Sequence, residues 1–226
     1  MIIGVVGSSG ERSIQDPLYS GATVIMDFER GIYRINGADI PVASMLSSVA
    51  QISAGRLNLV DGGAYAPIEL SSDIASALDF NGAGFSLYID FEQTNSATAG
   101  GLAAIIAGDI DTLDPALGGG WDIISYSQVY TEIWKAATSE SASTSVDLSQ
   151  GDGLRKVMGT VNSSTLAISY NGTLSSVESV AFSLPAVTVW HLGGYVTDST
   201  QDIDAAVRKI IAYPFKDPSE LNSYTI

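Results

Sequence analysis

The chain has 226 residues, of which 25 are acidic and 10 are basic, so its formal net charge is −15 at pH 7. An acidic surface of this kind repels a phosphate backbone, which argues against nucleic acid as a partner. The absence of cysteine excludes disulfides and thiolate metal sites. Apolar residues make up 46% of the chain, which is enough for a sizeable core and argues against disorder.

The first 20 residues contain three glycines and a proline and show no clear hydrophobic period. We interpret residues 1–20 as an extended arm that docks on a partner, followed by one domain over residues 21–226. The short apolar run at the start is too short for a signal-peptide core or a membrane span. We therefore expect a protein made in the cytoplasm without a signal peptide, and no membrane partner.

The segments that follow the arm have the pattern of strands. Strands are predicted within residues 22–29, 31–40 and 55–63, and Asn36-Gly37 supplies a two-residue turn. A short helical turn is predicted over residues 71–78, where Ser72 or Asp73 is the expected cap.

Residues 85–91 are the clearest strand, because apolar side chains occupy every odd position from Phe85 to Phe91. Strict alternation over seven residues places Ser86, Tyr88 and Asp90 on the opposite face. Further strands are predicted over residues 101–108, 121–127, 128–134, 154–161, 164–170, 181–184 and 187–194. A hairpin is predicted over residues 165–174, where Asn171-Gly172 supplies a two-residue type I′ turn. The Ser/Thr-rich segment 137–153 is interpreted as a surface loop.

The end of the chain has a strand pattern that stops at Pro214 and is followed by a small helix beginning at Asp217-Pro218. Arg208 and Lys209 are expected on opposite faces of this strand, one of them in an ion pair. A strand this late has to pair with much earlier strands. About ten strands with turn residues at regular intervals and almost no helix indicate a β-sandwich.

Four segments in the second half resemble the laminin-G-like or concanavalin-A-like jelly roll found in tailed-bacteriophage virion proteins. They are residues 154–164, 164–174, 189–195 and 207–221, and the last is the most specific because it combines a basic pair, a Tyr-Pro and an acidic closing turn. The resemblance implies an all-β, two-sheet antiparallel jelly-roll sandwich with a short C-terminal helical turn. It also implies a virion protein that partners other capsid or tail proteins.

The densest acidic cluster is Asp109, Asp111 and Asp114. Its spacing resembles the paired carboxylates of jelly-roll endoglucanases, but the proline and glycines that follow indicate a loop, so catalysis is not favoured. Clustered oxygen ligands on a loop would suit Ca²⁺. A solvated acidic turn is the alternative that we favour, because no bidentate glutamate follows.

Flat aromatic rings are candidates for binding sugars, whose C–H faces stack on them. Even spacing would give three aromatic side chains the same face of one continuous strand, and two tryptophans would join them from neighbouring strands. These candidates are Trp134, Tyr130, Tyr126, Trp121 and Trp190. Ordinary strand packing is the alternative that we favour, because aromatic residues are enriched in strands.

The single histidine, His191, has no nearby nucleophile pattern, so a catalytic triad is not indicated. Together with the resemblance to virion proteins, the lack of a catalytic pattern favours a first functional hypothesis: a non-enzymatic virion structural protein without a cofactor, as a capsid decoration, head spike or tail fibre component. Residues 1–20 would attach it to other virion proteins, and a homo-oligomer such as a trimer is expected. The alternative is a carbohydrate-binding module that recognises host-surface glycan, and the third is a glycoside hydrolase.

Overall fold

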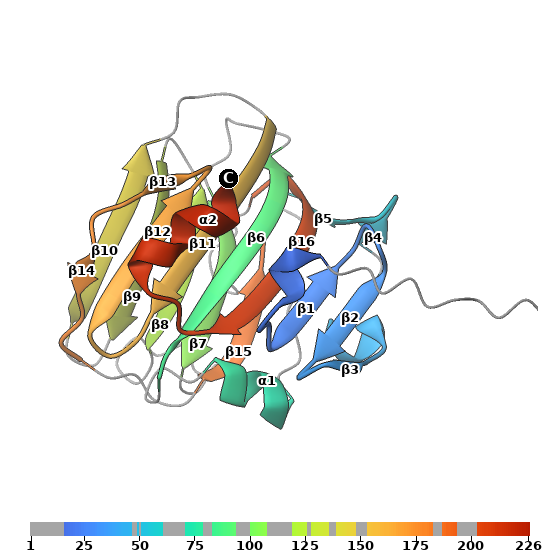
Figure 1. The fold of residues 1–226 in the computed structure, drawn as a ribbon, viewed down its shortest axis with the longest axis horizontal. Helices are drawn as coiled ribbons and strands as arrows, with labels where there is room; N and C mark the ends of the chain where they lie inside the picture. The colour runs from blue at the N-terminus through green and yellow to red at the C-terminus, as the bar shows by residue number, and fades with distance from the viewer. Residues whose placement is uncertain are drawn as a thin grey trace, which may run out of the picture.

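The computed structural model describes residues 16–46, 49, 51–60, 71–78, 83–93, 100–107, 119–125, 128–135, 139–147, 153–182, 187–193 and 203–226. The strands of these residues form two antiparallel sheets that lie face to face (Figure 1). This arrangement confirms the predicted all-β sandwich.

Within the described residues the larger sheet has eleven strands, in the order β13-β12-β11-β6-β16-β1-β2-β3, with β14, β5 and β4 attached at its sides. The strands are β1 (Val24–Asp27), β2 (Ile32–Ile35), β3 (Ala38–Asp39), β4 (Ile52–Ser53), β5 (Arg56–Leu59), β6 (Phe85–Gln93), β11 (Gly153–Val161), β12 (Thr165–Tyr170), β13 (Thr173–Leu174), β14 (Glu178–Ser179) and β16 (Ala205–Pro214).

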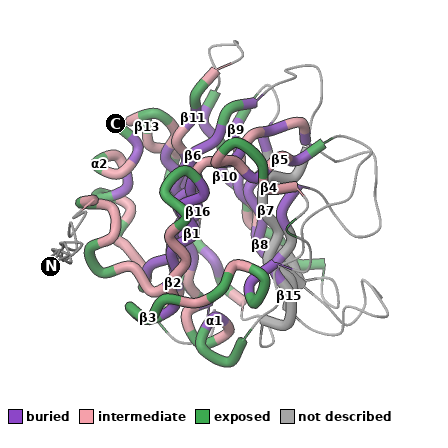
Figure 2. The backbone as a smooth tube through the Cα atoms, turned by 90° about the vertical axis from the view of Figure 1, so that its right-hand side faces the viewer, coloured by how far each residue is buried: buried purple, intermediate pink, exposed green. Residues whose placement is uncertain are grey.

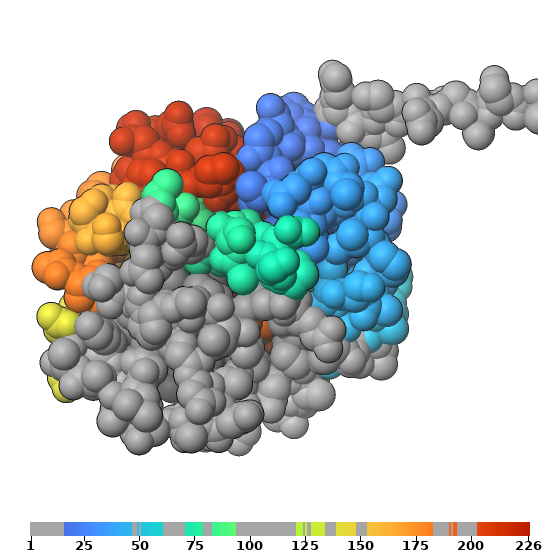
Figure 3. Space-filling view, turned by 90° about the horizontal axis from the view of Figure 1, so that it is seen from below, coloured from blue at the N-terminus to red at the C-terminus, as the bar shows by residue number. Residues whose placement is uncertain are grey.

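The last strand, β16, lies in the middle of the larger sheet. It pairs with β1 on one side, where Lys209 faces Asp27, and with β6 on the other, where Ile210 faces Ile89. The prediction that the terminal segment pairs with much earlier strands is therefore confirmed. Figure 3 shows the consequence at the surface, where the C-terminal residues (red) lie beside the N-terminal strands (blue).

The smaller sheet has five strands in the order β10-β9-β8-β7-β15. They are β7 (Gly100–Ala107), β8 (Gly119–Ser125), β9 (Gln128–Lys135), β10 (Glu140–Asp147) and β15 (Val187–Leu192). The prediction of a loop over residues 137–153 is corrected by β10. The strand has a period-two pattern in which Ala142, Thr144 and Val146 point inward and serines point outward. Because the outward side chains are serines, the segment resembles a polar loop in the sequence.

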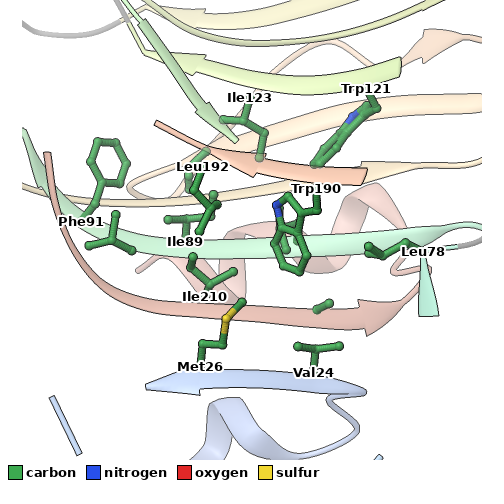
Figure 4. Packing of buried hydrophobic residues seen from close by; sticks show 14 of the residues in the cluster. Val24, Met26, Leu78, Ile89, Phe91, Trp121, Ile123, Trp190, Leu192 and Ile210 are labelled. Atoms are coloured by element: carbon green, nitrogen blue, oxygen red, sulfur yellow. The ribbon is translucent and has the colours of Figure 1, made fainter. Parts of the chain in front are cut away.

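The core lies between the two sheets. Trp121 and Trp190 point from the smaller sheet toward the larger one, where Figure 4 shows them among Val24, Met26 and Ile210. Both indole rings are fully buried, and the Trp121 ring packs edge-on against Phe85 with centroids 5.2 Å apart. Gly159 of β11 makes room for this ring, because a Cβ atom there would lie 2.6 Å from Cζ2 of Trp121.

A second apolar layer covers the outer face of the larger sheet. Helix α2 (Leu221–Thr225) lies on this face, away from β7 and β8 (Figure 2). Tyr88, Met158, Tyr213 and Leu221 are buried in this layer. The predicted alternation of residues 85–91 is confirmed, and both faces of the strand are buried because each is covered.

Short helical turns complete the described residues: η1 (Pro17–Tyr19), η2 (Val42–Ser44), α1 (Ser72–Ala77) and η5 (Pro218–Glu220). Helix α1 was predicted, but its cap is Ser71, whose side chain accepts a hydrogen bond from the amide of Ile74. The predicted cap positions, Ser72 and Asp73, lie inside the helix. None of the helices in the described ranges has the length and hydrophobicity to cross a membrane.

Both predicted Asn-Gly turns are confirmed. Asn36 and Gly37 connect β2 to β3, and Asn171 and Gly172 connect β12 to β13. All four residues have positive φ, as a type I′ hairpin turn requires.

A bulge in β16 corrects the prediction for its basic pair. Val207 pairs with Phe91 and Lys209 with Asp90, so Arg208 is inserted between them. Because of the extra residue, the next side chain after Val207 that points into the core is Ile210. Both basic side chains between them therefore lie on the outer face. Opposite faces were expected because an unbroken alternation was assumed.

Both side chains of the basic pair form ion pairs on that outer face. Arg208 lies 2.8 Å from Glu29, and Lys209 lies 2.9 Å from Asp16, which also pairs with Arg30. Asp16 belongs to the predicted arm of residues 1–20. Residues 16–20 therefore contact the folded domain, and residues 1–15 lie outside the described part of the chain.

Candidate functional site

The face of the smaller sheet that points away from the core carries the candidate site. In β9, Val129 and Ile133 belong to the core cluster, so the even-numbered positions of this strand face outward. Tyr130, Glu132 and position 134 therefore share the outer face of an uninterrupted strand. The same alternation places Asp122 of β8 outward, because Trp121 and Ile123 point into the core.

The register of the sheet brings two carboxylates together on this face. Glu132 is directly opposite Asp122 on one side and Ser143 on the other. Directly opposite like charges destabilise a sheet, because the side chains lie about 5 Å apart. A hydrogen bond on the inner side holds the two strands in this register, with Thr131 Oγ1 donating to the backbone oxygen of Asp122 over 2.6 Å.

The environment of Tyr130 and Glu132 shifts the pKa of each side chain. Burial raises the pKa of the Tyr130 phenol to about 12, with a further contribution from the carboxylates of Asp122 and Glu132. Burial also raises the pKa of Glu132. Asp122 is only 2% exposed. Perturbed titration near a surface is a feature of functional sites, because structural charges are usually paired or solvated.

Serines of β10 lie opposite both aromatic positions of β9, Ser145 beside Tyr130 and Ser141 beside position 134. Position 134 lies between Gly120 of β8 and Ser141 of β10 in the register of the sheet. The outward side chains of β10 next to it, Ser141, Ser143 and Ser145, are exposed. The outer face thus combines aromatic positions, two carboxylates and a row of hydroxyl groups, which are the groups that bind polyhydroxylated ligands.

The structure divides the predicted aromatic set. Tyr130 and position 134 share the outer face of β9 by the alternation of the strand, whereas Trp121 and Trp190 are core residues with no exposed ring surface. These two tryptophans are therefore unavailable for stacking on a surface ligand, because both sheets bury their rings. Tyr126 precedes β9 and lies outside the described residues.

The predicted acidic cluster, Asp109, Asp111 and Asp114, lies outside the described residues as well. Within the residues that the structure describes, no group of three His, Asp or Glu side chains could hold a metal ion. The His191 position is beside Ala104 of β7, on the same row as Asp122 and Glu132.

Sequence reasoning did not single out Glu132 or Asp122. Glu132 could have been found, because it lies between Tyr130 and Trp134 in the same alternation. Asp122 could not have been found, because its position opposite Glu132 depends on the pairing of β8 with β9 and not on the order of residues within either strand.

No protein-family model and no curated protein sequence matches the chain. Solved structures with the same fold do match. A CBM40 domain of the Ruminococcus gnavus IT-sialidase bound to α2,6-sialyllactose is 15% identical with a TM-score of 0.60, and the match covers 76% of this chain and 96% of that domain.

Two other solved structures extend the comparison. The binding domain of botulinum neurotoxin DC in complex with rat synaptotagmin II is 13% identical with a TM-score of 0.61, over 90% of this chain and 51% of that one. Domains LG4-5 of the mouse laminin α1 chain are 12% identical with a TM-score of 0.53, over 72% and 43%. These matches place the fold among jelly-roll, laminin-G-like sandwiches, and they provide no link to bacteriophage proteins.

Proposed function

We propose that the protein is a non-enzymatic carbohydrate-binding module whose ligand lies on the outer face of the smaller sheet. The observation that carries this proposal is the placement of Tyr130 and position 134 on one face of β9, with Glu132 between them and Asp122 opposite. An aromatic ring offers a flat apolar surface for the C–H face of a sugar. The half-buried Glu132 carboxylate and the exposed serine hydroxyls beside it can accept hydrogen bonds from sugar hydroxyls.

The comparisons support this proposal over the virion hypothesis. The Ruminococcus gnavus domain is a carbohydrate-binding module in complex with sialyllactose, and one botulinum neurotoxin DC structure is a complex with SialylT. Proteins of this fold therefore present glycan-binding surfaces on related frameworks. The virion location, the trimer and the attachment through residues 1–20 stay predictions from the sequence resemblance.

The experiment that tests the proposal is a glycan array with the purified chain, followed by calorimetry on the glycans that bind. Trp134→Ala and Tyr130→Ala should each weaken binding by about tenfold, because each removes a stacking surface. Trp134→Phe and Tyr130→Phe keep a ring and should retain most of the affinity. Wild-type affinity in both alanine variants would place the ligand elsewhere, and hydrolysis of bound glycans would contradict the non-enzymatic part.

A further inference from the structure

We infer that the glycan recognised at this face is uncharged, and that sialylated and sulfated glycans are rejected by it. The inference rests on the proposed function and concerns the chemical class of its ligand. It separates this chain from the Ruminococcus gnavus module of the same fold, which is in complex with sialyllactose. It follows from where the positive charges of the chain are located and from what they contact.

The smaller sheet is almost devoid of positive charge. Lys135 is the only Lys or Arg between Arg56 and Arg155 in the sequence, and none lies between Lys156 and Arg208. Strands β7 to β10 and β15 fall within these two stretches. Position 135 ends β9 opposite Gly119 of β8 and Glu140 of β10, and by the alternation of the strand it is on the side of Val129 and Ile133, not on that of Tyr130 and Glu132. The outer-face strand positions therefore include no Lys or Arg.

Negative charge is abundant in the stretch of sequence that supplies four of the five strands of the smaller sheet. Residues 94–152, which contain β7 to β10, hold eight Asp and Glu: Asp109, Asp111, Asp114, Asp122, Glu132, Glu140, Asp147 and Asp152. Three of them occupy outward positions among the described strands, namely Asp122, Glu132 and Asp147. A carboxylate or sulfate on a ligand would meet Glu132 and Asp147, and no Lys or Arg among the outer-face strand positions would compensate for the desolvation of the ligand's charge.

The larger sheet offers no alternative cationic surface among its described residues. Arg30 and Lys209 pair with Asp16, Arg34 with Asp39, and Arg56 and Arg208 with Glu29. Lys156 of β11 donates to the backbone oxygen of Ile226, and Lys216 lies over the rings of Tyr213 and Tyr224, 5.7 and 5.9 Å from their centroids. An anionic sugar at any of these positions would have to compete with a carboxylate, backbone oxygen or ring that already holds the cation.

Arg155 is the cation nearest to the interior, and it is held by the protein. Its side chain is 3% exposed and donates to Gln93 Oε1 and to Ser125 Oγ, the latter over 2.8 Å. Ser125 in turn donates to Gln93 over 3.0 Å. This buried network crosslinks the two sheets between β11, β6 and β8, so the guanidinium group is directed into the sandwich and away from the outer face.

The test is an array on which each neutral oligosaccharide is printed beside its sialylated and its sulfated counterpart, with lactose and 3′-sialyllactose as the simplest pair. At low ionic strength the neutral member of a pair should bind about tenfold more tightly, because added salt has not yet screened the repulsion. Raising the salt concentration should reduce this difference. Glu132→Gln should reduce it as well.

A second variant tests the charge effect without changing Glu132. Ser143→Asp adds a charge at an exposed position beside Glu132 and should increase the discrimination against the sialylated member, whereas Ser143→Asn should leave it unchanged. Equal or tighter binding of sialylated glycans at low salt would overturn this inference and leave the proposed function standing. Binding of no glycan at all would overturn the proposed function, and this inference with it.

Discussion

At the scale of single residues, Asp90 is the least favourable charge in the larger sheet. Its carboxyl group is 4% exposed, its Oδ1 atom accepts no hydrogen bond, and Arg208 lies 3.7 Å away. Burial raises the pKa of Asp90 above its ordinary value, although Arg208 and Lys209 lower it in part. The folded state therefore keeps the proton at a pH where the unfolded chain has lost it.

This raised pKa predicts a pH-dependent effect of Asp90→Asn. Stability contributed by this group falls as pH rises from the unfolded pKa through the folded pKa, because the folded state binds more protons in that window. The variant should therefore gain roughly 1 kcal/mol on wild type at pH 7, and the gain should fade toward pH 3. Urea unfolding at both pH values measures the difference.

Glu29 provides the control of opposite sign. Its hydrogen bond with Arg208 lowers the pKa of Glu29, so its contribution is present above the unfolded pKa and is lost as pH falls through the folded pKa. Glu29→Gln should lose stability at pH 7 and approach wild type in acid. If both variants change in the same direction with pH, the assignment of charge states around Arg208 is wrong.

At the scale of elements, the bulge in β16 leaves Lys209 on the outer face, where it pairs with Asp16 in the segment before β1. Lys209 lies between Asp16 and Asp27, at 2.9 and 3.6 Å, and Tyr19 donates to Asp27 over 2.5 Å. The side chains of Lys209, Asp16 and Asp27 are largely buried. Removal of the ammonium would leave two carboxylates facing each other in a poorly solvated site.

Lys209→Met should therefore destabilise the fold by about 3–5 kcal/mol, and Asp16→Asn should cost less. In the double variant the loss should be smaller than the sum of the two, because the second change removes a charge that the first left unpaired. Chemical denaturation of all four proteins at pH 7 gives the coupling energy. Additive losses would mean that Lys209 and Asp16 do not interact in solution.

The elements also divide what the sequence could predict from what it could not. Strict alternation in residues 85–91 and the two Asn-Gly turns predicted β6 and two hairpins, because both signals are local. Strand β10 was missed since its inward positions include only one strongly apolar side chain, Val146. The bulge at Arg208 was missed because an inserted residue is defined only by the partner strand, which is more than 100 positions away.

At the scale of the whole molecule, the larger sheet depends on its last strand. β16 separates β1 from β6, and among the described strands no other pairs with both. Sequence reasoning predicted this closure from the late strand pattern. It could not predict the outer face of the smaller sheet, because the row that joins Ser143, Glu132 and Asp122 depends on the registers of two strand pairs.

A chain that ends at residue 202 should therefore fail to fold. It would expose the apolar edges of β1 and β6 and lose the strand that joins them. We expect loss of the near-ultraviolet circular dichroism signal and increased binding of a hydrophobic dye. A chain that ends at Lys216 keeps β16 and is the control, because it lacks only α2 and η5. A native signal from the shorter chain would contradict the central role of β16.

The position of β16 also bears on how the protein emerges from the ribosome. The N-terminal hairpin is synthesised first, yet its partner in the larger sheet is made some 180 residues later. Translation must therefore reach β16 before the hairpin can join β6, and the nascent chain has to hold two unmatched apolar edges until then. A molecule built in this way gains its native state late and as a unit, and a stalled or prematurely terminated product is a natural substrate for chaperones.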